Sequence, residues 1–282
     1  METKTALQVH HESYCDEMLK IAAEVGYKYV SIAFGSGMTL QPVDWADEIV
    51  RIKKLLDSLG LVCVMTHAPY YDLRISAEIT NENMERALLR CVEATAMLGA
   101  EIAAIHPRGY YAGGVEQTEK SYEINVKNIA PLVKKAGICG CLIGIENLPT
   151  FPGWDMTFYS NFPQEHKRPI DSFSRDSVCG VWDFGHSFLA NEDPSAALKL
   201  LGSRIRGTHV HDNNRKNDDH LPPYFGSIDW KTEIEALKQT GYSGFLTMEL
   251  EYQSRIDERD FIREYFKTAH DNCDKLSAML CD

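Results

Sequence analysis

The chain has 282 residues, 44% hydrophobic and 25% charged, with a formal net charge of -12 at pH 7. This length suits one large α/β domain, and we find no linker that would divide it, so we expect a single domain over 1–282. Nucleic-acid binding relies on Lys and Arg that neutralise phosphates, so the acidic balance argues against such a partner. The sequence shows no membrane span and no signal-peptide pattern, which predicts a cytoplasmic protein.

The eight cysteines are spread along the chain without a CxxC pair, and several stand in apolar runs such as LVCVMTH. We therefore predict buried free thiols rather than disulfides. Cys139 and Cys141 in ICGCLIG are only a weak metal-binding pattern, because one residue separates them and no second pair follows.

Short apolar, β-branched runs recur along the chain and predict strands at 5–11, 27–34, 61–67, 101–107, 141–147, 179–185, 205–211 and 244–250. Helical patterns lie between them at 13–26, 45–60, 81–99, 121–137, 194–203 and 230–241, with a closing helix near 260–280. Several of these helices end in Gly directly before the next strand, as a helix C-cap does. Repeated β-then-α units predict a closed (β/α)8 TIM barrel, with reactive groups at the C-terminal ends of the strands.

The connection at 149–176 is the irregular part of this pattern. It is long, aromatic and proline-containing, so we expect a lid or binding loop with only a short helix. A poorly ordered surface excursion is the alternative.

Four of the predicted strands end in a side chain that can bind a metal ion: Glu146, Asp183, His209 and Glu249. A carboxylate in such a strand is costly to bury unless something pairs with it. An unrelated strand-end polar residue is a common finding for any one of these positions, but not for all of them together. Their convergence predicts an oxygen-rich cage with one imidazole, suited to Mn, Mg, Co or Zn.

Alternation along the strands gives a second test, because alternate residues face the barrel interior. If His209 points inward, His211 does as well. Trp182 and Phe184 flank Asp183 on the opposite face, where we expect them to pack against helices.

Other strand ends carry further ligand-type groups, namely His67, His106 and His186. A lone strand-end His is more often a hydrogen-bonded core or rim residue than a ligand. Asp218 and His220 form an Asp-x-His pair that could add another metal arm, although a solvated charged loop explains this segment equally well.

The segments HAPY, IHP, IEN, DFGH, HVHDN, DDH and MEL resemble, in their order and spacing, the xylose isomerase-like barrel superfamily of sugar isomerases, epimerases and endonuclease IV. The resemblance covers most of the chain and is strongest to sugar phosphate isomerase-like members. For the ketose 3-epimerase branch it implies one ion on Glu146, Asp183, His209 and Glu249, with both glutamates as the acid/base pair. It also implies substrate binding by His186 and Arg215, and we add His67 and His106 as substrate-binding candidates.

For the endonuclease IV branch, the resemblance implies a three-zinc site on His67, His106, Glu146, Asp183, His186, His209, Asp218, His220 and Glu249. Two departures weigh against that branch. The segment PYYDL lacks the Asn expected before the Leu, and HLPPYFG lacks the compact glycine turn expected after the Asp-x-His pair.

The resulting hypothesis is a divalent-metal-dependent isomerase or epimerase that acts on a sugar, sugar phosphate or related polyol through proton transfer and a metal-stabilised enediolate. A lyase or dehydratase on a cyclitol would use the same residues, and an endonuclease IV-like zinc phosphodiesterase is the third alternative. Tyr70, Tyr71, Tyr110, Tyr111 and Trp154 could form apolar walls for a sugar ring or could be ordinary packing residues. Barrels of this kind often associate through their outer helices, which leaves a homo-oligomer open.

Overall fold

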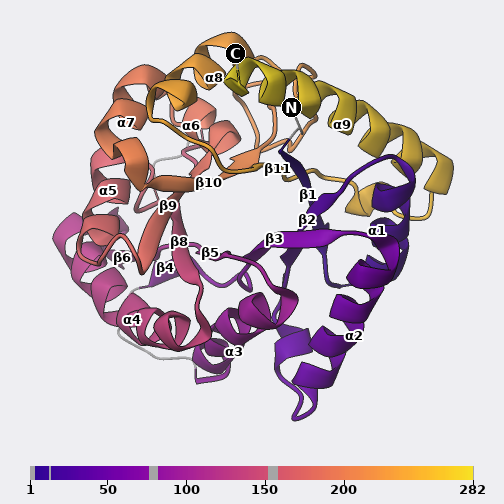
Figure 1. The fold of residues 1–282 in the computed structure, drawn as a ribbon. Helices are drawn as coiled ribbons and strands as arrows, with labels where there is room; N and C mark the ends of the chain where they lie inside the picture. Colours follow the sequence, from indigo (N-terminus) through magenta and orange to yellow (C-terminus); the bar gives the residue numbers. More distant parts are fainter. Residues whose placement is uncertain (1–3, 13, 76–81, 152–157, 282) are drawn as a thin grey trace.

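The computed structural model describes residues 4–12, 14–75, 82–151 and 158–281. Parallel strands close into an eight-stranded barrel in the order β1-β11-β10-β9-β8-β5-β3-β2, which confirms the predicted (β/α)8 TIM barrel. Figure 1 views this ring with the helices around it. The barrel strands are β1 (Thr5–His10), β2 (Tyr29–Ala33), β3 (Val62–His67), β5 (Ile102–Ile105), β8 (Leu142–Glu146), β9 (Val178–Asp183), β10 (Ile205–Val210) and β11 (Leu246–Met248).

The helices that cover the barrel are α1 (Cys15–Glu24), α2 (Trp45–Leu59), α3 (Glu82–Leu98), α4 (Thr118–Cys139), α5 (Pro163–Asp171), α6 (Phe184–Leu189), α7 (Pro194–Leu201), α8 (Trp230–Gln239) and α9 (Arg259–Cys281). Each buries an apolar face, as α2 does with Ile49, Ile52 and Leu56. Gly60 ends α2 in the left-handed conformation, as its position in the sequence predicts. None of the described helices is long and apolar enough to cross a membrane.

Two helices differ from the sequence prediction. Helix α4 begins at Thr118 and passes through Gly137 to Cys139, because the left-handed residue that ends it is Gly140. Helix α6 was not predicted, and it begins where β9 ends because the Asp183 side chain accepts a hydrogen bond from the backbone N–H of His186. This N-cap turns the chain into a helix at the mouth of the barrel.

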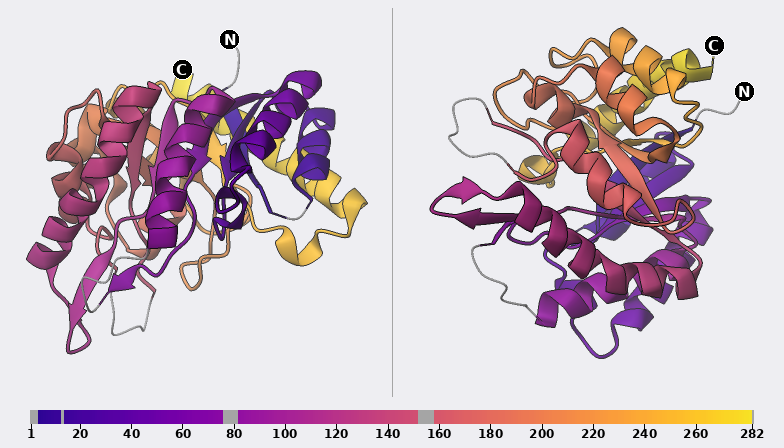
Figure 2. Two further views of the ribbon diagram at one scale, coloured as in Figure 1. Left: turned by 90° about the horizontal axis from the view of Figure 1, so that it is seen from below. Right: turned by 90° about the vertical axis from the view of Figure 1, so that its left-hand side faces the viewer.

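The long connection after β8 contains the predicted short helix, α5. His166 docks this helix on the barrel, since its Nε2 donates to the backbone oxygen of Ile145 at 2.7 Å. Trp154 lies outside the described residues, so its part in a lid or wall stays a prediction. Near the same mouth, β4 (Arg74–Ile75), β6 (Gly109–Ala112) and β7 (Val115–Glu116) form a small separate sheet, and Figure 2 shows its hairpin projecting from the barrel.

The barrel interior below the C-terminal mouth is filled by a small apolar cluster: Met65, Ile102, Ala104, Leu142, Cys179 and Val181. Space here is tight, because a Cβ at Gly144 would lie 2.6 Å from the Val181 side chain. All eight cysteines are free, as predicted, and only Cys139 and Cys281 are not fully buried. The apolar layer therefore supports the polar side chains that the strands carry above it.

Candidate metal centre

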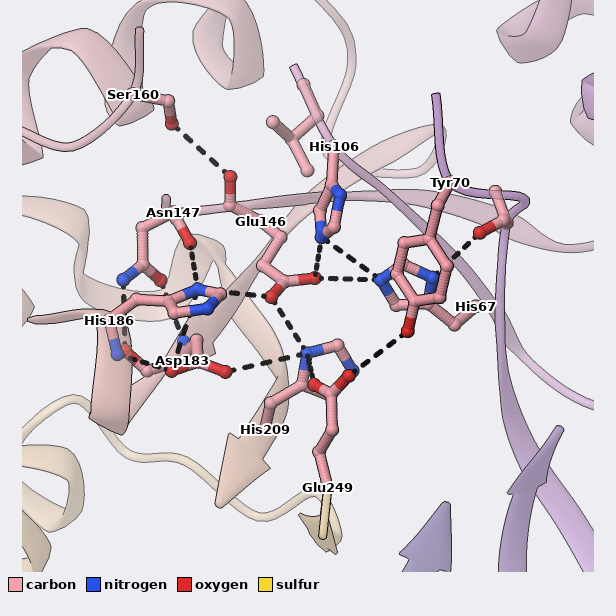
Figure 3. Close-up of polar contacts among 12 residues, drawn as sticks. His67, Tyr70, His106, Glu146, Asn147, Ser160, Asp183, His186, His209 and Glu249 are labelled. Carbon is pink, nitrogen blue, oxygen red and sulfur yellow. Dashed lines mark hydrogen bonds and ion pairs between the residues drawn. The ribbon is translucent and has the colours of Figure 1, made fainter. Parts of the chain in front are cut away.

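Glu146, Asp183, His209 and Glu249 converge at the C-terminal mouth of the barrel, and we call these four residues the cage. They come from the ends of neighbouring strands, and their exposed fractions are 0%, 0%, 0% and 6%. The Nδ1 atom of His209 lies 3.1 Å from Glu146 Oε1, 3.3 Å from Glu249 Oε2 and 3.9 Å from Asp183 Oδ2 (Figure 3). The strand-end pattern in the sequence therefore predicted a true spatial cluster.

The cage fits a cation because its buried polar atoms are not satisfied by one another. Glu146 Oε1, Glu249 Oε2 and both ring nitrogens of His209 have no hydrogen-bond partner among the described residues. Buried polar groups in native proteins are nearly always paired, so such a set calls for a further partner. Three carboxylates and one imidazole are the donors that Mn, Mg, Co or Zn accept.

A second set of ligand-type atoms shares Glu146 with the cage, and we call His67, His106 and Glu146 the side group. Glu146 Oε2 lies 3.2 Å from His67 Nε2 and 3.4 Å from His106 Nε2, while the two Nε2 atoms are 3.2 Å apart. One oxygen of Glu146 therefore faces the cage and the other faces the side group (Figure 3). A carboxylate in this position can bridge two ions.

A third set, which we call the outer group, consists of His186, His211, Asp218 and His220. Asp218 Oδ2 lies 3.1 Å from His186 Nε2 and 3.2 Å from His220 Nε2. The rings of His211 and His220 stack with centroids 4.0 Å apart, and His211 Nε2 reaches Asp183 at 3.1 Å. The outer group thus adjoins the cage through Asp183, and His211 is a member that the predicted ligand set did not contain.

Backbone carbonyls orient three of these histidines. The Nδ1 atoms of His67, His186 and His220 lie 2.8, 2.9 and 3.1 Å from the backbone oxygens of Ala68, Asn147 and Glu249. A carbonyl can only accept, so each Nδ1 donates its proton. Each Nε2 is then left to face its group, as in histidines that bind metals.

The groups perturb one another's protonation strongly. Burial alone would lower the pKa of His209, but Glu146 and Glu249 raise it to about 9. Burial opposes charge on Glu249 as well, yet His209 and His220 lower its pKa to about 2. Asp218 likewise raises the pKa of His220 to about 10 against the effect of burial. Without an ion, the carboxylates therefore hold protons on His209 and His220, and a bound cation would take over the charge of those protons.

Residues that bind no ion hold the groups in place, and the sequence prediction did not include them. Asn147 ties β8 to β9, accepting from Asp183 N at 2.7 Å and donating to Asp183 O at 2.9 Å. Buried Asp212 accepts hydrogen bonds from Tyr224 N, Ile228 N and Trp230 Nε1, which fixes the loop that carries Asp218 and His220 of the outer group.

Gly185, directly after β9, allows the ring of His211 in the outer group to lie against the backbone. A Cβ at this position would lie 1.9 Å from Cε1 of His211, so only glycine leaves room for that ring. In the sequence, the Gly of the DFGH segment was the feature that could have indicated this close contact.

Arg215 is a predicted site residue that lies in none of the cage, the side group and the outer group. Its side chain lies over the Phe188 ring, 4.0 Å from the centroid, and donates to Asn191 Oδ1 at 2.8 Å. Its role in substrate binding stays a prediction.

The packing expectations for β9 are confirmed, because Trp182 lies against His166 of α5 and Phe184 against Trp230 of α8.

The chain is similar in sequence to curated proteins and similar in fold to solved structures. The curated relatives include an uncharacterized protein from Methanocaldococcus jannaschii, 24% identical over 74% of this chain and 71% of the relative. A D-psicose 3-epimerase from Enterocloster bolteae is 27% identical over 44% of this chain and 38% of the relative. A solved L-ribulose 3-epimerase has a TM-score of 0.77 at 15% identity, covering 99% of this chain and 96% of its own.

The family described as xylose isomerase-like TIM barrel matches residues 19–270, nearly the whole length of the described barrel. This match spans all the strands that carry the cage, the side group and the outer group. The chain therefore belongs to the xylose isomerase-like TIM barrel family.

Proposed function

We propose that this protein is a divalent-metal-dependent isomerase or epimerase that moves a carbon-bound proton next to the carbonyl of a sugar or related polyol. The observation that carries the proposal is the pair of buried glutamates, Glu146 and Glu249, which lie 3.1 and 3.3 Å from the Nδ1 atom of His209. Carboxylates that are both ion ligands and potential bases suit proton transfer beside a chelated carbonyl. The D-psicose 3-epimerase relative and the ketose 3-epimerase structures support this choice.

The cage would hold the ion, through Glu146, Asp183, His209 and Glu249. When bound, a divalent ion supplies Lewis acidity to a carbonyl and an adjacent hydroxyl of the substrate. The protein's own part is to exclude water, since the cage is almost completely buried, and to keep the ligands in position through Asn147 and the strand ends.

The proton transfer balances with the two glutamates as acid and base. Glu249 accepts the proton when the C–H bond breaks, and the electron pair of that bond enters the carbonyl system to form an enediolate. Protonated Glu146 gives a proton to the opposite face, which forms the new C–H bond and restores the carbonyl. Proton exchange with water then returns Glu249 to its carboxylate form and Glu146 to its acid form.

The remaining predicted substrate contacts are assigned by position. His186, His67 and His106 line the same mouth and would contact substrate oxygens where they do not bind a second ion. Arg215 would have to leave Phe188 to reach the substrate, so we assign it a role only in a closed form of the loop.

The test is exchange of a ketose carbon-bound proton for solvent deuterium, measured by NMR with the ion-loaded protein and a panel of free and phosphorylated ketoses. Glu249→Gln should lower exchange by about 100- to 10,000-fold while leaving the fold intact, because it removes the base and little volume. Glu251→Gln is the matched control, since Glu251 is exposed and accepts hydrogen bonds from Gln253 N and Ser254 N instead. Wild-type exchange in Glu249→Gln would refute the assignment.

A second candidate is phosphodiester hydrolysis, favoured by the presence of three adjoining ligand groups. Three ions could occupy the cage, the side group and the outer group, with Glu146 between two of them. Asp218→Asn separates the two candidates because it alters only the outer group. A phosphodiesterase should lose hydrolysis of bis-p-nitrophenyl phosphate in this variant, whereas an epimerase should retain deuterium exchange.

A dehydratase is the third candidate, favoured by relatives of that name. An inosose dehydratase from Clostridium perfringens is 20% identical over 62% of this chain and 66% of the relative. Removal of the carbon-bound proton would be the same first step, followed by departure of a neighbouring hydroxyl as water. Incubation with a keto-cyclitol, followed by mass spectrometry for loss of water, distinguishes this outcome from epimerisation.

A further inference from the structure

Tyr70 lies over the histidines of the metal centre, on the loop that follows β3. Its ring centroid is 5.0 Å from that of His67, 5.7 Å from that of His106 and 6.4 Å from that of His10. Its hydroxyl donates to Glu249 Oε1 at 3.3 Å, and Figure 3 shows the phenol directed at that carboxylate. Tyr70, a candidate aromatic wall of the mouth, is thus hydrogen-bonded to a cage ligand.

The position of Tyr70 is set by the loop after β2 and does not depend on Glu249. The backbone N–H of Tyr70 donates to Gly35 O, and the backbone N–H of Phe34 donates to His67 O. Gly37 has positive φ, and a Cβ there would lie 2.8 Å from the Cβ of Pro69, so the two loops are in close contact. The phenol is therefore held in advance at the point where it meets the carboxylate.

The two oxygens of Glu249 have different surroundings. Oε1 accepts the hydrogen bond from Tyr70. Oε2 has no hydrogen-bond partner among the described residues and faces His209 Nδ1 at 3.3 Å, inside the cage. If the carboxylate bound an ion through both oxygens, both would have to face the cage, and neither would be held by a hydrogen bond outside it.

We infer that Tyr70 is a positioning residue that makes Glu249 a one-oxygen ligand, with Oε2 directed to the ion and Oε1 reserved for proton transfer. The ligand half of this inference stands on the cage alone, and the proton-transfer half rests on the proposed function. When Oε1 takes the substrate proton, the phenol keeps its own proton and turns from donor to acceptor.

The ligand half is tested with Co2+, whose visible absorption weakens as the number of its ligands increases. In Tyr70→Phe, Oε1 loses its hydrogen bond and should join Oε2 on the ion, so the visible absorption should fall. Tyr71→Phe is the matched control, because the adjacent Tyr71 hydroxyl donates to the backbone oxygen of His106 and not to Glu249. That variant should keep the wild-type spectrum, whereas a wild-type spectrum in Tyr70→Phe would overturn the inference.

The proton-transfer half is tested by deuterium exchange in the same variant. Loss of a group that orients a ligand typically costs about 10- to 100-fold, and we expect a loss of that size in the exchange rate at saturating substrate. An unchanged rate together with a changed Co2+ spectrum would leave Tyr70 as a ligand-positioning residue and overturn its role in catalysis. If the wild-type protein exchanges no ketose proton, the proposed function fails, and the Co2+ spectrum still decides whether Tyr70 sets the ligand mode of Glu249.

Discussion

The cage and the outer group adjoin each other through Asp183, yet the chain builds them in different ways. Cage residues stand on or directly after barrel strands and are at most 6% exposed. The outer group takes two members, Asp218 and His220, from the loop between β10 and α8, and their side chains are 19% and 21% exposed. The strand ends place the cage, whereas hydrogen bonds within a loop place Asp218 and His220 of the outer group.

This difference teaches that the two groups depend on different parts of the molecule. The cage can change only if the barrel changes, because parallel strands in fixed register carry it. The outer group can be lost by a change in its loop, since Asp212 and the Asp212–Leu221 bridge hold that loop in place. Variants that affect one group and spare the other are therefore the way to test the comparison.

The largest effect is expected for Glu146→Gln, because Glu146 belongs to both the cage and the side group. Ion binding to both should be lost. The ion-free protein should be destabilised by about 3–5 kcal/mol, because buried His209 loses a partner of opposite charge. Elemental analysis and urea unfolding with a chelator measure the two effects. Unchanged ion content would show that Glu146 is not a ligand.

A smaller and more selective effect is expected for Asp212→Ala. Donors such as Trp230 Nε1 and Ile228 N lose their buried acceptor, which should cost about 1–3 kcal/mol of unfolding free energy. Ion binding by the outer group should weaken and that by the cage should persist. Asp219→Ala in the same loop is the control, since the hydrogen bond that Asp219 accepts within the described part of the chain is a long one, 3.3 Å from Asn214 N. Equal losses in both groups would contradict the comparison.

Ion binding should release protons from His209 and His220, so the ion affinity of the cage and of the outer group should depend on pH. The pKa of His209 is raised to about 9 and that of His220 to about 10, so both rings are protonated near neutral pH without an ion. A histidine binds a metal only after losing that proton, so ion affinity should rise with pH until these values are passed. Calorimetry in two buffers of different ionisation enthalpy counts the protons. Binding without proton release would contradict the charge state described for the ion-free protein.

The smallest effect on the metal centre is expected for Glu233 in α8, which lies away from it. Its side chain is 5% exposed, and burial with Asp229 nearby raises its pKa to about 8. Between the ordinary pKa and this value the unfolded chain ionises while the folded protein keeps the proton, so stability falls as pH rises. Glu233→Gln should remove this slope, with a melting-temperature gain that grows up to pH 8 and is absent in acid. A gain equal at all pH values would refute the raised pKa.

The barrel and the cage could be predicted because short apolar runs predict the strands and the cage ligands stand at the ends of those runs. Each cage ligand ends a run such as IGIE or VWD whose inward and outward faces the sequence shows directly. The strand ends also indicated His67, His106 and His186, and the Asp-x-His pair indicated Asp218 and His220. Family resemblance then joined these residues into one ligand set. What these ligands bind in the folded chain, ion or substrate, is not contained in the pattern.

The features that were missed depend on chain reversals and long-range contacts. Helix α6 requires that Asp183 cap a helix with the same side chain that faces the cage. Tyr70 was recognised only as a wall, because its contact with Glu249 joins residues 179 positions apart. His10 ends β1 in the mouth beside Tyr70, and the strand-end rule that found His67 could have found it too.

The most direct test is anomalous scattering from crystals of the protein loaded with Mn2+. The account predicts a peak within ligand distance of Glu146, Asp183, His209 and Glu249, and its loss in Asp183→Asn. A peak at the outer group with none in the cage would contradict the account, because the buried glutamates would then stand beside no ion that could activate a carbonyl.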